Sequence, residues 1–102
     1  MPLDFRVVPF TIEGDDDETR NDEARFNSEI IRANVAIQSF RLDIQPPSAS
    51  PEMNIVEVAA IAGPPVQNEV NVTLRTHYAG KARGVEYRAD VRVLVIAEVK
   101  GP

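Results

Sequence analysis

Side chains that could do acid–base or nucleophilic chemistry are scarce in this chain. His77 is the single histidine, cysteine is absent, and no serine stands in a nucleophile motif. The glycine-containing segment 80–84 lacks the spacing of a phosphate-binding loop. We therefore expect a non-enzymatic protein with no catalytic residue, no cofactor and no metal site.

Four polar residues remain as candidate ligand contacts, namely Arg75, His77, Glu86 and Arg88. They flank a short predicted loop at 79–84, and a ligand would sit at the strand ends or between subunits. The alternative for His77 is a strand residue that simply faces solvent.

Residues 13–18 form a dense acidic run, Glu-Gly-Asp-Asp-Asp-Glu. Carboxylate oxygens suit Ca²⁺, but in an EF-hand alignment Arg20 takes the place of the required glycine. Phe26 likewise stands where the bidentate glutamate belongs. A solvated acidic loop is the simplest interpretation, with an irregular cation site or a docking surface for a basic partner as alternatives.

Charge and hydropathy exclude several classes of partner. The 102 residues carry a net charge of −5, and nucleic-acid binding needs a cationic surface. No apolar run approaches the roughly 20 residues of a membrane-spanning helix. The first residues show no basic region followed by an apolar stretch, so no signal peptide is expected. We expect neither nucleic acid nor membrane as a partner. The compartment stays open, with a virion or another extracellular particle as one setting.

The elements that must position these side chains are strands, and the clearest pair spans residues 66–99. Apolar residues hold most even positions from Val66 to Tyr78 and every odd position from Val85 to Val99. Alternate residues of a strand point to opposite faces, so each arm has one buried face. We predict a hairpin, with either His77 opposite Glu86 or, in the favoured register, Arg75 opposite Asp90.

Two further strands are predicted upstream of this pair. Residues 3–12 form one, and Pro9 favours an edge position because it cannot donate to a ladder. Residues 34–44 form another, whose apolar phase flips at Gln38-Ser39 and so predicts a β-bulge or a change of sheet.

The remaining segments give a helix and a strand. Residues 19–27 predict a short helix capped by Thr19. Residues 54–62 are apolar on both parities, which is consistent with a strand buried on both faces.

The pattern as a whole predicts an all-β protein, an antiparallel β-sandwich of about six strands with an acidic N-terminal segment that holds one short helix. Residues 1–33 would be a strand plus an acidic arm packing on the domain or on a neighbour, and residues 34–102 the sandwich core of a single domain.

Leu94 and Ile96 interrupt the polar face of the last strand. Two large apolar side chains left on an exposed strand invite association, so we expect something to cover them. One cover is the N-terminal segment, through Phe5, Phe10 or Phe26. The other is a second subunit, and these five residues are the candidate interface.

The segments 35–44, 72–76 and 93–97 resemble corresponding strands of the H-type lectin family, small six-stranded sandwiches that form trimers or hexamers. The resemblance implies this architecture and oligomeric habit. The tryptophans typical of that family are absent here, so its sugar-binding residues are not carried over. Sandwiches of this type also look like tail, fibre and decoration modules of phage-like particles.

The function expected from the sequence is a structural module that self-associates or decorates a larger assembly such as a virion, tail or fibre. Its partners would be copies of itself or subunits of that assembly. The alternative is a carbohydrate-binding module with a glycan as ligand.

Overall fold

A computed structural model describes residues 2–14, 17–45, 55–79 and 86–101. Within them the chain forms six strands: β1 (Leu3–Gly14), β2 (Glu18–Arg25), β3 (Ile30–Gln45), β4 (Ile55–Ala62), β5 (Glu69–Ala79) and β6 (Glu86–Val99). The expected all-β class is confirmed. The helix predicted over 19–27 is wrong, since the described residues contain no helix and that segment is β2.

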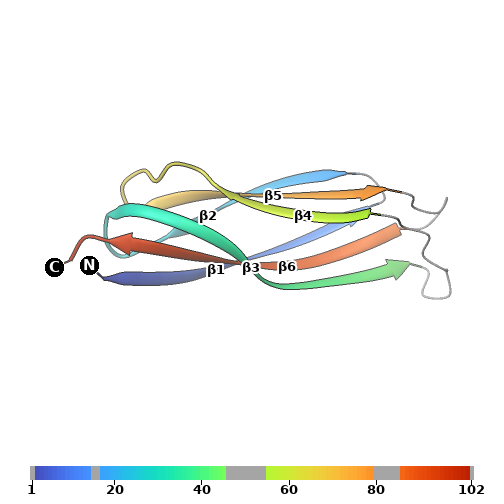
Figure 1. The fold of residues 1–102 in the computed structure, drawn as a ribbon, viewed down its shortest axis with the longest axis horizontal. Helices are drawn as coiled ribbons and strands as arrows, with labels where there is room; N and C mark the ends of the chain where they lie inside the picture. Colours follow the sequence, from blue (N-terminus) through green and yellow to red (C-terminus); the bar gives the residue numbers. More distant parts are fainter. Residues whose placement is uncertain (1, 15–16, 46–54, 80–85, 102) are drawn as a thin grey trace.

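The strands make two antiparallel sheets of three strands each. Sheet A has the order β1-β6-β3 and sheet B the order β2-β5-β4. Their apolar faces share one core, in a sandwich-like arrangement that is long and narrow, 54 × 19 × 17 Å (Figure 1). The long axis follows from strand length, because β3 has 16 residues and each residue of a strand advances about 3.3 Å.

The predicted hairpin of residues 66–99 is wrong as a pairing. β5 pairs with β2 and β4, whereas β6 pairs with β1 and β3. The two strands instead face each other across the core, and the rings of Tyr78 and Tyr87 lie 5.4 Å apart. Both arrangements bury the even residues of β5 and the odd residues of β6, so alternation alone does not distinguish a hairpin from two facing strands.

The central strands carry the core. On β5 and β6 the fully buried side chains are Val70, Val72, Leu74, Tyr87, Ala89, Val91, Val93, Val95 and Ala97. These are the parities that alternation assigned to the interior. Most of the stabilising burial in this protein therefore lies along the facing surfaces of β5 and β6.

The edge strands bear out two smaller expectations and contradict a third. β1, with Pro9, is an edge strand, and the register of β3 shifts between Ile37 and Ser39, which confirms the bulge. β4 is also an edge strand, and Val56 and Ile61 are exposed on its two faces. The expectation that residues 54–62 are buried on both faces is therefore wrong.

The chain begins and ends at the same end of the molecule (Figure 1), where the Val99 amide donates to the Pro2 carbonyl at 3.1 Å. Residues 1–33, expected as a strand plus an arm, contribute an edge strand to each sheet.

Glycine at position 14 ends β1 with φ of 140°, a conformation that side-chain-bearing residues rarely adopt.

Candidate functional site

Three of the five candidate interface residues lie together on the outer face of sheet A. Phe5 is paired with Ile96, and Val7 with Leu94, so the four side chains form adjoining rows. Phe5 and Val7 are 51% and 46% exposed, whereas Leu94 and Ile96 are half-buried between their neighbours. The N-terminal strand thus lies beside Leu94 and Ile96 rather than over them. These four side chains and Leu3 form an apolar surface that we call the outer patch.

Phe10 and Phe26, the other two candidates, lie in the core on the opposite face. The interpretation that they cover Leu94 and Ile96 is therefore wrong. Phe10 faces the core because it shares the even parity of β1 with the buried Val8 and Ile12, and it pairs with the buried Val91.

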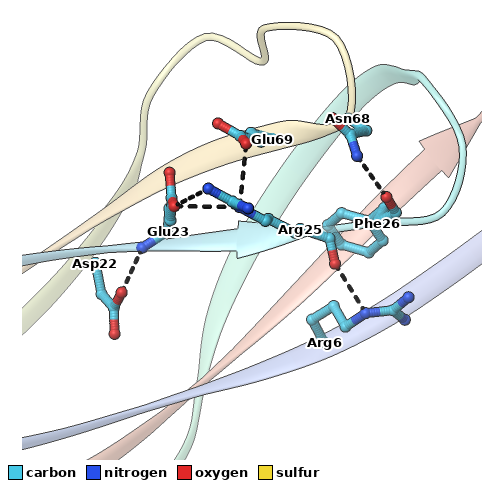
Figure 2. A network of polar contacts seen from close by, with 7 residues as sticks. All are labelled: Arg6, Asp22, Glu23, Arg25, Phe26, Asn68 and Glu69. Atoms are coloured by element: carbon cyan, nitrogen blue, oxygen red, sulfur yellow. Dashed lines mark hydrogen bonds and ion pairs between the residues drawn. The ribbon is translucent and has the colours of Figure 1, made fainter.

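Phe26 is buried just after the end of β2, and Figure 2 shows it within a network of contacts from three segments of the chain. The Arg6 guanidinium lies 4.9 Å from the centre of its ring, and Arg6 Nε donates to the Arg25 carbonyl at 3.0 Å. Asn68 Nδ2 donates to the Phe26 carbonyl at 2.9 Å, and the Phe26 amide donates back to the Asn68 carbonyl. This network ties β1 of sheet A to the ends of sheet B, so the role of Phe26 is structural.

A second exposed apolar surface was missed by the sequence analysis. On the core face of sheet A, Val93 is flanked by Val8 of β1 and Ile37 of β3, yet Val8 is 4% exposed and Ile37 39%. In the next row, Val91 is flanked by Phe10, 7% exposed, and Phe40, 43% exposed. The core is therefore closed along β1 and open along β3.

Sheet B is open along the same side of the molecule, because β4 lies beside β3. Val56 pairs with the buried Tyr78 and faces the core, but is 40% exposed. We call Ile37, Phe40 and Val56 the open seam. Full burial of such a side chain is worth roughly 1.5–3 kcal/mol, so covering the exposed part of each, about 40%, would add roughly 0.6–1.2 kcal/mol.

Charge distinguishes the two edges of sheet B. Along the core face of β5, the partners on β2 are Glu18, Arg20 and Asp22, whereas the partners on β4 are Val58, Ala60 and Ala62. Inward-pointing charges on an edge strand prevent other chains from adding to it. The β2 edge is protected in this way and the β4 edge is not. The unprotected edges could have been recognised from the sequence, because the core-facing rows of 33–42 and 56–62 carry no charged residue.

The four predicted ligand contacts are not brought together. Arg75 and His77 lie on the outer face of sheet B, and Glu86 and Arg88 on the outer face of sheet A. The expected pairs His77–Glu86 and Arg75–Asp90 do not form, since the strands belong to different sheets. Within one subunit these four residues therefore do not form a single site, and their role as ligand contacts stays a prediction.

His77 has a partner that the hairpin prediction did not include. Its Nδ1 lies 2.8 Å from Asp17 Oδ2, and Asp17 Oδ1 accepts the Tyr78 amide at 3.1 Å. One carboxylate of the acidic run thus anchors the start of β2 to the end of β5. Asp15 and Asp16 lie outside the described residues. Where the chain is described, no cluster of His, Asp and Glu has the arrangement of a metal site.

A hollow of about 500 Å³ lies on the outer face of sheet A, beyond the outer patch. Its middle row consists of Thr11, Asp90 and Arg41 on the three strands, and Arg88 and Arg92 stand on either side of Asp90 along β6. Its lining also includes the apolar residues Phe10, Phe40 and Val91. Arg88, one of the predicted ligand contacts, belongs to this hollow.

Three hydroxyl groups are buried at the far end of the core, those of Thr76, Tyr78 and Tyr87. None of them has a partner at hydrogen-bonding geometry among the described residues, and the Thr76 hydroxyl beside Tyr78 only partly offsets the effect of burial on the Tyr78 pKa. Burial raises the pKa of Tyr78 above its ordinary value of 10.0, because the phenolate would lose its hydration.

This pKa shift predicts a loss of stability in alkali. The folded state holds the Tyr78 proton more tightly than the unfolded state. The contribution of Tyr78 to the free energy of unfolding is therefore fully present below pH 10.0 and is lost as the pH rises through the folded pKa. Urea unfolding followed from about pH 8 to about pH 12 should show this fall, and Tyr78→Phe should make it shallower. An unchanged pH dependence in Tyr78→Phe would contradict the assignment.

Comparison with protein-family models, curated proteins and solved structures found no match. The part of the chain that the structure describes holds no helix long and apolar enough to cross a membrane.

Proposed function

We propose that this protein is a non-enzymatic structural subunit, a β-sandwich that associates with copies of itself to build or decorate a larger particle or fibre. The observation that carries the proposal is the open seam. Ile37 and Phe40 face the core as Val8 and Phe10 do, yet they are about 40% exposed where their counterparts are buried. A second subunit packed against β3 and β4 would complete the core on that side.

The occupant is inferred from the edges of the sheets. β2 carries charges that prevent association, and β1 carries Pro9, whereas β3 and β4 present apolar rows without charge. Contact between two such seams would bury apolar side chains against apolar side chains, as in the self-complementary interfaces of symmetric oligomers. The elongated shape also suits a subunit of a fibre, because molecules that are long and narrow can associate side by side along their strands.

The mass of the protein in solution tests this proposal. Sedimentation equilibrium over a range from about 1 to about 500 μM should give a mass that is a multiple of 11.3 kDa, or one that rises with concentration. A folded protein that stays at 11.3 kDa throughout that range would refute self-association.

Carbohydrate binding is a second candidate function, and one observation supports it. The hollow on the outer face of sheet A combines a carboxylate, a hydroxyl and arginines in a volume of about 500 Å³. Small-molecule sites commonly occupy about 300–1,000 Å³ and present a few converging polar groups. The resemblance to H-type lectins suggested this function, but it supplied no residues for the site.

A further inference from the structure

We infer that the hollow around Asp90 binds a sugar acid, with the ligand carboxylate on Arg92 and its hydroxyl groups on Asp90. This inference rests on the second candidate function, carbohydrate binding, and names its ligand class. It does not require self-association, because its polar groups Asp90 and Arg92 lie on the outer face of sheet A, whereas Ile37 and Phe40 belong to the core-facing rows, with Phe40 also bordering the hollow.

The charges around the hollow leave one arginine uncompensated. Arg41 Nε lies 3.2 Å from Asp43 Oδ2, and Arg88 Nε lies 3.4 Å from Asp90 Oδ2. Arg92, by contrast, makes no ion pair or hydrogen bond with any described residue, although it stands on the central strand between Pro9 and Ser39. A guanidinium offers five donors in a planar fork that matches a carboxylate, so Arg92 is the anion-binding group of the hollow.

Asp90 is held in place and keeps acceptor capacity. Its Oδ1 accepts a hydrogen bond from Thr11 Oγ1 at 2.8 Å, and its Oδ2 faces Arg88. Each carboxylate oxygen has two lone-pair sites, so both oxygens can still accept a ligand hydroxyl. The orientation is fixed before a ligand arrives, and this lowers the entropic cost of binding.

Together these groups select a ligand with two kinds of polar group. A simple anion would use Arg92 alone, and a neutral sugar would use Asp90 alone. A monosaccharide that carries a carboxylate uses both, and a volume of about 500 Å³ suits a molecule of that size.

Titrations of the full ¹⁵N-labelled chain with three probes test the inference: glucuronate, glucose and acetate. Amide signals of residues around Asp90 and Arg92 should shift with glucuronate, with an affinity at least about tenfold higher than for either other probe. In Arg92→Gln, glucuronate should bind no more tightly than glucose. Arg92 is exposed, so this variant should keep the fold.

Arg75→Gln is the matched control, because Arg75 also lacks a described partner, lies on the outer face of sheet B and makes the same change in charge. It should leave the glucuronate affinity unchanged. If glucose binds as tightly as glucuronate, carbohydrate binding stands and the sugar-acid inference is overturned. If acetate binds as tightly, the hollow is only an anion site and the inference fails. If no probe shifts these signals, both fail.

Discussion

Phe40→Lys should turn an associating protein into a monomer. The side chain sits in the middle of the open seam, 43% exposed in a lone subunit, and the proposed partner would bury it. An ammonium group in that contact loses its hydration without gaining a partner. Aromatic residues at the centre of an interface commonly contribute 2 kcal/mol or more, so the dissociation constant should rise at least about 30-fold. Sedimentation velocity at matched concentrations measures this.

Val7→Lys is the matched control for Phe40→Lys. Val7 belongs to the outer patch and is 46% exposed, so the two variants add the same charge at sites of similar exposure. If the seam is the interface, Val7→Lys should keep the mass of the unmodified protein. The reverse result, a monomer with Val7→Lys and an oligomer with Phe40→Lys, would move the interface to Phe5, Leu94 and Ile96. Circular dichroism of both variants shows whether the fold is kept.

Leu74→Ala should produce the largest loss of stability of any single truncation proposed here. Leu74 is completely buried at the centre of β5, so its removal leaves a cavity as well as lost apolar burial. Such substitutions cost about 2–5 kcal/mol, against a total of about 5–15 kcal/mol for a typical domain. The urea midpoint should fall while the m-value stays the same, because the surface exposed on unfolding is nearly unchanged.

Leu94→Ala provides the comparison for Leu74→Ala. Leu94 carries the same side chain on the facing central strand, but it points to the outer face of sheet A and is only half-buried. Its truncation opens no enclosed cavity, so the loss should be well below that of Leu74→Ala. Both measurements belong at low protein concentration, where association adds little to stability. Equal losses would mean that the outer face is covered as completely as the core.

If the proposed assembly forms, the difference between the two edges of sheet B would give it a direction of growth. Glu18, Arg20 and Asp22 protect one side, and the apolar rows of β3 and β4 leave the other side available. A subunit built in this way can join others through one side while remaining soluble on the opposite side. This is the physical basis on which the assembly proposal depends.

Local pattern correctly predicted the buried faces of β5 and β6, although not those of β4. The even residues of β5 and the odd residues of β6 are buried, the bulge lies at Ile37–Ser39, and Pro9 marks an edge strand. Each of these properties belongs to one strand and its own pleat, so each can be read without knowing the neighbours. For the candidate site, the pattern selected Phe5, Leu94 and Ile96 together with Phe10 and Phe26, and only the structure shows that the first three adjoin on the outer face of sheet A while the other two lie in the core.

The predicted helix failed because its signals were local and weak. Thr19 was a suitable cap, but the apolar stripe behind it was thin. Pairing of Glu18–Arg25 with β5 over eight residues provides partners for the backbone groups of β2 that point toward β5. Tertiary pairing routinely overrides propensities of a few tenths of a kcal/mol per residue. The same pairing explains why Phe26, expected on a helix face, ends up under Arg6 at the end of the core.

The amino-acid sequence by itself determined the all-β class, the buried face of each central strand and the scarcity of catalytic groups, because these depend on side-chain type and on the two-residue period of a strand. Only the tertiary structure decided which strands share a sheet. It placed β5 and β6 in different sheets, separated Arg75 from Arg88, and left the core open along β3 and β4. Pairing is a competition among all strands of the chain, and its outcome depends on contacts between residues far apart in sequence.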